Sequence, residues 1–140
     1  MPIPDDYASA AARHVNDARL LCEADRWDNA GYLAGYAIEC SVKAVIDRAD
    51  LPPLHTHLNE IPRELLALAA DLNLAARRYP VDVDPDVAAV RTAWATKLRY
   101  AQTGALAATD ARSLVDSAER VFGRTIVAMV LDGFFERVPR

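Results

Sequence analysis

The sequence has few glycines and cysteines and no strand pattern, and each of these narrows the fold class. It contains five glycines among 140 residues, and no window alternates apolar and polar residues long enough to predict a strand. Cys22 and Cys40 fall on different predicted helices without metal-binding spacing, so we interpret them as reduced core residues. With 52% hydrophobic residues and recurrent alanine, the composition favours an all-α fold. This length is typical of one domain, residues 1–140, that buries a core without disulfides.

The chain also lacks a basic excess, a leader segment and a long apolar run. Its formal net charge of −4 argues against a non-specific nucleic-acid binder, although it leaves room for a small basic pocket. The N-terminal string MPIPDDYAS has neither the basic nor the apolar region of a signal peptide. The longest apolar run, Ile126 to Leu131, is too short to span a bilayer. We therefore expect a cytoplasmic protein with no membrane partner.

The stretch from Asp28 to Asp47 is predicted to be the central helix. Asp28 is a suitable N-cap, and Gly31 and Gly35 are expected to let a neighbouring helix come close. At about 100° per residue, its apolar residues cover well over half of the circumference. A helix with so much apolar surface is typical of the middle of a bundle.

One line of polar residues interrupts this apolar helix. Tyr32, Tyr36, Glu39 and Lys43 follow one another at spacings of four, three and four, which places them on one side of the helix. Glu39 and Lys43 could form an ordinary exposed salt bridge, which contributes about 0.2–0.5 kcal/mol. If the helix is central, both charges need further partners because desolvation costs several kcal/mol per ion.

Further helices are predicted on both sides of this one. Their expected ranges are Asp6 to Asp25, Glu60 to Asn73, Asp86 to Leu98, and Asp110 into the 130s with Thr109 as the cap. The segment from Leu74 to Asp86 reads as a loop whose Arg77 and Arg78 carry solvated charge. The expected inward-facing residues are Tyr7, Ala11, His14, Ala18 and Leu21 of the first; Leu65, Leu68 and Leu72 of the next; Val87, Val90, Trp94 and Leu98; and Val115, Ala118, Phe122, Ile126 and Met129 of the last.

The histidines give little support for a metal centre. His55 and His57 could ligate a metal, but no third or fourth ligand lies near them in the sequence, so we expect no metal and no cofactor. Arg48 and His55 satisfy an Arg-x6-His spacing, yet they lie on opposite sides of a double proline. Arg99 follows a predicted helix, where a cation interacts favourably with the helix dipole.

Three strings together resemble the HEPN domain family. They are AGYLAGYAIECSVKAVID in the central helix, HTHL at His55 to Leu58, and Arg-Tyr-Ala at Arg99 to Ala101. The resemblance covers about Tyr7 to Val130. It implies an up-and-down bundle of four to five helices that commonly forms a homodimer. It also implies a prokaryotic toxin–antitoxin or defence context, in which many such domains are encoded beside a nucleotidyltransferase partner.

The resemblance leaves two functional branches open. One branch binds nucleotides or serves a nucleotidyltransferase. The other consists of metal-independent endoribonucleases with an Arg-x4–6-His motif, and here no histidine follows Arg99. We therefore favour a module that binds nucleotide or RNA, with a purely structural helical interaction partner as a nearly equal alternative. A divergent endoribonuclease toxin using His57 or His55 with Arg99 ranks below both. The expected ligand-binding residues are Tyr32, Tyr36, Glu39, Lys43, His57, Arg99 and Tyr100.

Overall fold

The computed structural model describes residues 5–52, 54–73, 79–94 and 96–134, and these residues form helices without any strand. The predicted all-α fold class is therefore confirmed. The elements are α1 (Tyr7–Glu23), α2 (Trp27–Arg48), the 3-10 turn η1 (Leu58–Glu60), α3 (Arg63–Asn73), α4 (Pro85–Ala93), the 3-10 turn η2 (Thr96–Tyr100), α5 (Ala108–Phe122), the π-helical segment η3 (Gly123–Val127) and α6 (Ala128–Leu131).

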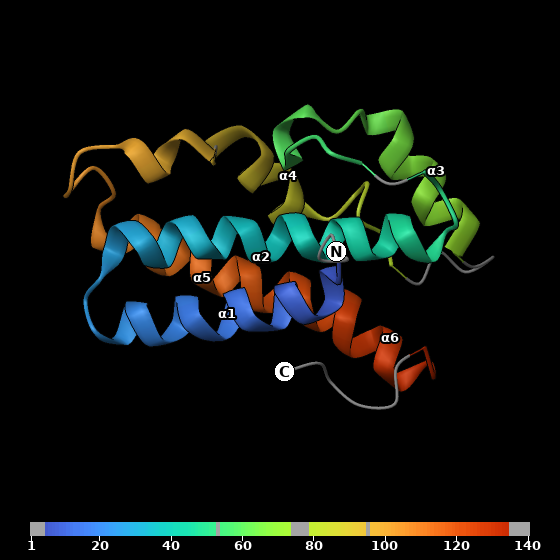
Figure 1. The fold of residues 1–140 in the computed structure, drawn as a ribbon, viewed down its shortest axis with the longest axis horizontal. Helices are drawn as coiled ribbons and strands as arrows, with labels where there is room; N and C mark the ends of the chain where they lie inside the picture. Colours follow the sequence, from blue (N-terminus) through green and yellow to red (C-terminus); the bar gives the residue numbers. More distant parts are fainter. Residues whose placement is uncertain (1–4, 53, 74–78, 95, 135–140) are drawn as a thin grey trace, which may run out of the picture.

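Helix α2 lies at the centre of an up-and-down arrangement. Helix α2 runs antiparallel to α1. The segment of α4 and η2 then leads the chain back along α2, and α5 runs parallel to α2 (Figure 1). Helices α1 and α5 pack on one side of α2, while α3, α4 and η2 cover the other side (Figure 1). This arrangement buries α2 on most of its circumference, as its apolar pattern predicts.

The two glycines of α2 accommodate side chains rather than a neighbouring helix backbone. A Cβ atom at Gly31 would overlap Leu106, and a Cβ atom at Gly35 would overlap the indole of Trp94. The indole Nε1 of Trp94 donates to the carbonyl oxygen of Tyr32, at 3.1 Å. The absence of a side chain at Gly35 thus lets α4 end with its tryptophan directly against α2.

Two predicted helix caps are wrong. Helix α2 begins one residue before Asp28, and the Asp28 carboxylate instead accepts from the backbone N–H groups of Gly104 and Leu106, at 2.8 and 3.0 Å. These two hydrogen bonds lower the pKa of Asp28 and tie the start of α2 to the loop before α5. Helix α5 begins at Ala108, so Thr109 lies inside its first turn and does not cap it.

Several predicted inward-facing positions are also wrong. Leu68 and Leu72 are exposed, and Leu66, Ala69 and Ala70 are the buried residues of α3. Helix α4 is shorter than predicted because it ends at Ala93, with Trp94 as its C-cap and Leu98 in η2. In α1 the predicted positions Ala11 and Ala18 are buried, whereas Tyr7, His14 and Leu21 are half-buried. The buried seam of α1 consists of Ala8, Ala11, Ala12, Val15, Ala18 and Cys22.

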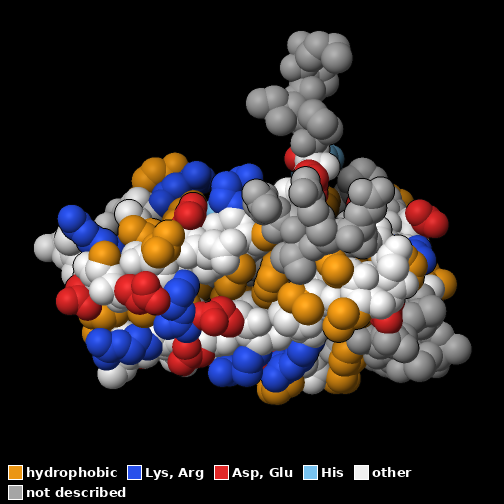
Figure 2. Space-filling model, turned by 90° about the horizontal axis from the view of Figure 1, so that it is seen from below, with side chains coloured by type: hydrophobic (Ala, Val, Ile, Leu, Met, Phe, Trp, Pro, Cys, Tyr) orange, Lys and Arg blue, Asp and Glu red, His pale blue; other side chains and the backbone are white. Residues whose placement is uncertain are grey.

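Ion pairs link α1 and α4 to α5 and η3. Arg19 of α1 contacts Asp116, at 2.8 Å, and Glu119. Arg120 and Arg124 contact Asp86 at the start of α4, and Arg124 also contacts Asp84, at distances of 2.8–3.1 Å. Figure 2 shows the face on which α1 lies, where basic and acidic side chains are interspersed. No single sign of charge dominates that face.

The remaining sequence expectations concern cysteines, metals and membranes. Cys22 and Cys40 are free and buried, as predicted, and burial raises the pKa of the Cys40 thiol to about 12. Within the described ranges no group of histidine, cysteine and acidic residues could hold a metal ion. No described helix is long and apolar enough to cross a membrane. Arg77 and Arg78 lie outside the described residues.

Candidate functional site

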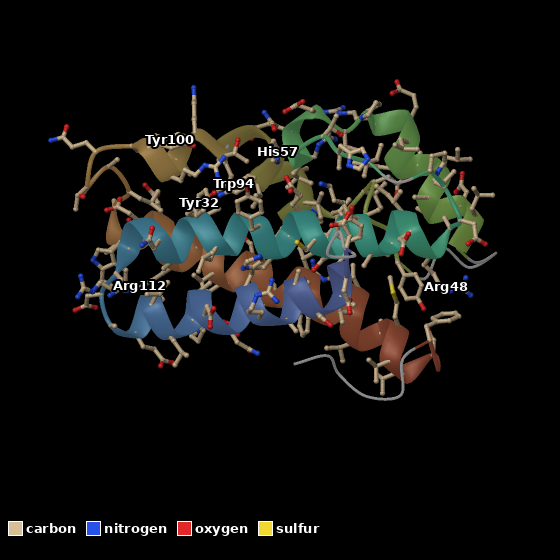
Figure 3. All side chains as sticks on the ribbon, in the orientation of Figure 1. Tyr32, Arg48, His57, Trp94, Tyr100 and Arg112 are labelled. Carbon is tan, nitrogen blue, oxygen red and sulfur yellow. The ribbon has the colours of Figure 1, made fainter. Side chains whose placement is uncertain are left out.

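The polar line of α2 lies partly in the core and partly beside η1, α4 and η2. Glu39 and Lys43 are 3% and 9% exposed, while Tyr32 and Tyr36 are half-buried. Figure 3 shows Tyr32, Trp94, His57 and Tyr100 on the same side of α2, whereas Arg112 and Arg48 lie on the opposite side of the view. The line predicted from spacing therefore contacts the second half of the chain.

Glu39 is the centre of a buried polar network. Its carboxylate accepts a hydrogen bond from the backbone N–H of Leu58, at 2.7 Å, and lies 3.3 Å from Nδ1 of His57. The ammonium of Lys43 lies 3.5 Å away, one helical turn along α2. These groups supply the partners that a buried carboxylate requires, so the charge does not remain uncompensated in the core.

The contact with Glu39 also fixes the orientation of the His57 ring. A carboxylate can only accept, so Nδ1 carries the proton in this contact and Nε2 is the nitrogen left for another partner. The segment that carries His57 is held from its other side by Arg91. That guanidinium donates to the carbonyl oxygens of Leu58, at 3.3 Å, and of Ile61. A buried carboxylate and a half-buried guanidinium thus clamp η1 between them.

Tyr36 is the centre of an aromatic cluster. Its ring lies 5.0 Å from Tyr32 and 5.1 Å from Trp94, both edge to face, and 6.3 Å from His57. His14 of α1 approaches the same ring, at 5.8 Å. Burial, followed by the hydrogen bond with Tyr32, raises the pKa of Tyr36. The phenol therefore stays neutral at physiological pH.

Arg99 lies at the edge of this cluster. It is exposed, and its guanidinium lies 5.0 Å from the ring of Tyr100, which is 78% exposed. The positive charge of Arg99 acts to lower the pKa of Tyr36. The adjacent Tyr100 lies on the same side of α2 as Tyr32, Trp94 and His57 (Figure 3). Arg99 also lines a hollow of about 440 Å³, together with Trp27 and residues of the loop before α5. The other borders of that hollow do not include Tyr36 or His57.

The structure thus brings five of the seven expected residues into direct contact in one group. Tyr32, Tyr36, Glu39, Lys43 and His57 are linked through the contacts above, and Arg99 with Tyr100 lies next to them on η2. Lys43 is too deeply buried to be a direct ligand contact. Its spacing in the sequence does not reveal this burial, because the spacing does not show which helices cover the side chain. Arg48 stacks on Phe134, with its guanidinium carbon 3.8 Å from the ring centre.

Sequence reasoning missed three members of the site. Trp94 was assigned to the core alone, although its indole also contacts Tyr32 and Tyr36. His14 was assigned to the seam of the first helix, and burial and the nearby Arg13 lower its pKa. Arg91 was not singled out. Nothing in the sequence around Arg91 indicates that its side chain would hold η1, which lies about 30 residues earlier in the chain.

Comparison with known proteins identifies the family. The sequence pattern of the HEPN domain family matches residues 5–126, which covers most of the chain and every residue of the site. The chain belongs to the HEPN domain family. No curated protein and no solved structure matches the chain. The HEPN match supports a function related to nucleotides or RNA, and the particular ligand has to be argued from this site.

Proposed function

We propose that this HEPN domain binds a nucleotide or single-stranded RNA on the surface formed by Tyr32, Tyr36, His57, Arg99 and Tyr100, which we call the aromatic surface. The observation that carries the proposal is the position of Arg99. It is an exposed arginine beside an aromatic cluster, and no carboxylate of the described residues pairs with it. A guanidinium can contact a phosphate in a bidentate way, while phenol and imidazole rings stack on bases.

Glu39 and Lys43 have a supporting role in this proposal. Lys43 is buried and its ammonium faces the Glu39 carboxylate, so we assign the phosphate contact to Arg99 rather than to Lys43. Glu39 orients His57 from behind, and the pair fixes the register of α2 against η1. Removal of Glu39 is then expected to weaken binding through His57 and to destabilise the fold.

One observation favours a second function, a divergent metal-independent endoribonuclease. Cleavage requires a base for the 2′-hydroxyl proton and a cation for the charge that develops on the phosphate. His57, with Nδ1 held by Glu39, offers Nε2 for the first role, and Arg99 offers a cation for the second. We place this activity second because no histidine follows Arg99 in the sequence, so the Arg-x4–6-His motif of the endoribonuclease branch is absent.

Protein partners form a third part of the proposal. We propose that the domain forms a homodimer or binds a nucleotidyltransferase in a toxin–antitoxin or defence setting. Exposed apolar side chains at the end of the bundle, such as Leu131 with 81% exposure, support an association of this kind. Size-exclusion chromatography with light scattering at micromolar concentration tests the homodimer, and a monomer would overturn that part.

The ligand is tested by a thermal-shift and binding titration with nucleoside triphosphates and a short single-stranded RNA, in the presence of a chelator. A ligand that binds only the native state raises the melting temperature by mass action. Arg99→Ala removes the proposed phosphate contact. Arg48→Ala is the matched control, because Arg48 is exposed, stacks on Phe134 and lies on the other side of α2 from Trp94 and His57 (Figure 3).

The proposal expects intact RNA and a shift that is lost in Arg99→Ala and kept in Arg48→Ala. An equal shift in both variants would contradict it. RNA cleaved in chelator, with cleavage lost in His57→Ala, would instead establish the endoribonuclease. If neither a thermal shift nor RNA cleavage is observed, the remaining interpretation is a helical domain whose ligand is another protein.

A further inference from the structure

A pocket with two arginines in its lining lies beside η1. It has a volume of about 310 Å³ between η1, the start of α3, and α4. Its polar lining includes Asn59, Arg63, Arg91 and Thr92. Asn59 is two residues after His57, which is at most about 7 Å along the chain. The pocket is therefore a direct neighbour of the proposed binding surface.

Both arginines of this pocket lack an acidic partner. Arg63 pairs with no carboxylate of the described residues, and Arg91 contacts neutral carbonyl oxygens. Arg91 uses two of its five N–H groups for these carbonyls, and the others have no partner within the described part of the chain. Asp82 also lines the pocket, and no described hydrogen bond or ion pair joins it to Arg63 or Arg91.

The surroundings of Arg91 favour an anion in this pocket. Burial, and then the neighbouring Arg63, lower the pKa of Arg91, so the two positive charges lie close enough to repel each other. An anion between the two guanidinium groups would offset this repulsion. A phosphate suits the pocket because it accepts from several N–H donors at once.

We propose that this pocket is a second phosphate subsite and that the natural ligand is a strand of RNA several nucleotides long rather than a mononucleotide. The inference rests on the proposed function, because the aromatic surface would hold the first nucleotide. The strand would then cross η1, with one phosphate at Arg99 and a later one between Arg63 and Arg91. Clamping of η1 by Glu39 and Arg91 keeps the two subsites at a fixed separation.

The test compares two probes, a mononucleotide and an oligouridylate of about six nucleotides, within the usual size of single-strand sites. Arg63→Ala is the informative variant, because Arg63 is exposed and holds no described partner, so the fold is expected to survive its loss. We expect Arg63→Ala to weaken oligouridylate binding about tenfold. We also expect the slope of log K against log salt to fall by about 0.7, which is one phosphate contact on a single strand. Mononucleotide binding should not change.

Arg99→Ala separates the two proposals. If it weakens both probes while Arg63→Ala changes neither affinity nor salt slope, the second subsite is overturned and the aromatic surface stands. If Arg63→Ala weakens the mononucleotide as much as the oligonucleotide, the pocket binds the mononucleotide itself and the strand model is wrong. If the wild-type protein binds neither probe, the proposed function fails and this inference fails with it. Arg63→Lys, which keeps the charge, should retain most of the salt slope.

Discussion

Two groups of arginines in this protein differ in their partners. The paired arginines, Arg19, Arg120 and Arg124, each contact one or two carboxylates and link α1 and α4 to α5 and η3. Arg48 and Arg112 also lack a described carboxylate partner, but they stack on Phe134 and Trp27. Three further arginines without a described carboxylate partner, Arg63, Arg91 and Arg99, which we call the unpaired arginines, contact carbonyl oxygens or an aromatic ring, or have no described partner. All three belong to the layer of α3, α4 and η2 on the other side of α2 (Figure 1).

The difference separates stability from binding. A surface arginine that pairs with acids contributes to the fold and offers little to a ligand, because its donors and its charge are already used. An arginine without an acid keeps both available. The overall charge of −4 conceals this division, because it does not show which arginines pair with acids. An acidic protein can thus hold a local surface for phosphate groups.

Removal of Glu39 should have the largest effect on stability, because it leaves the buried Lys43 as another cation without an acidic partner. Glu39→Ala leaves the buried Lys43 ammonium without its carboxylate and the Leu58 N–H without an acceptor. We expect a loss of about 3–5 kcal/mol in the free energy of unfolding, measured by urea denaturation. The double variant Glu39→Leu with Lys43→Met, which removes both charges, should recover much of this loss. A loss below about 1 kcal/mol in Glu39→Ala would show that the network is not buried in solution.

Gly35→Ala sharpens the comparison because it alters the aromatic surface without changing any charge. The new Cβ would overlap the indole of Trp94, which is buried and cannot move freely. We expect a loss of about 2–3 kcal/mol by overpacking, together with weaker ligand binding as Trp94 shifts against Tyr32 and Tyr36.

The matched control is Gly123→Ala, whose Cβ would meet no atom within 4 Å and whose φ of −62° is helical. That variant should be neutral or more stable, because alanine is a better helix former than glycine. Equal stability of Gly35→Ala and wild type would contradict the close packing of Trp94.

Asp86 tests the paired arginines through pH. Hydrogen bonds from Arg120 lower the pKa of Asp86 from 3.8 to about 2. A lowered pKa stabilises the fold above the unfolded value, and the contribution disappears as the pH falls through the folded value. We expect Asp86→Asn to cost about 1–2 kcal/mol at pH 7. The difference in melting temperature from wild type should shrink between about pH 4 and pH 2. A difference independent of pH would mean that the ion pairs do not stabilise the protein.

The smallest effect on stability should come from Arg63. Arg63→Ala removes no described contact of its side chain, so the free energy of unfolding should change by less than about 0.5 kcal/mol. Arg120→Ala, which loses its bonds to Asp86, should destabilise the protein more than Arg63→Ala in the same assay. Equal losses in the two variants would remove the basis of the comparison.

The sequence predicts the helices well and the site in part, for physical reasons that specific residues illustrate. The apolar circumference of α2 predicts its central place because helical periodicity is a local property. The spacing of Tyr32, Tyr36, Glu39 and Lys43 predicts their common side for the same reason. Contacts across the fold cannot be read in this way. Asp28 has the chemistry of an N-cap, yet its carboxylate accepts from a loop more than 70 residues later.

Exposure is the other property that the sequence conceals. Leu68 and Leu72 follow a helical spacing but lie outside, because the seam of α3 runs through Leu66 and its alanines. Lys43 has the charge for a phosphate contact, but the surrounding helices bury it. Arg63 and Arg91 give no signal at all, because a pocket formed by two distant segments exists only after folding.

The most direct test of the account measures two properties of two variants side by side, oligouridylate affinity by fluorescence anisotropy and the free energy of unfolding by urea. The account predicts opposite results. Arg99→Ala should lose about tenfold or more in affinity with little change in stability, while Arg120→Ala should lose stability and keep its affinity. Unchanged affinity in Arg99→Ala, or an equal loss of affinity in Arg120→Ala, would contradict the central claim that the unpaired arginines of the α3, α4 and η2 layer form the ligand surface.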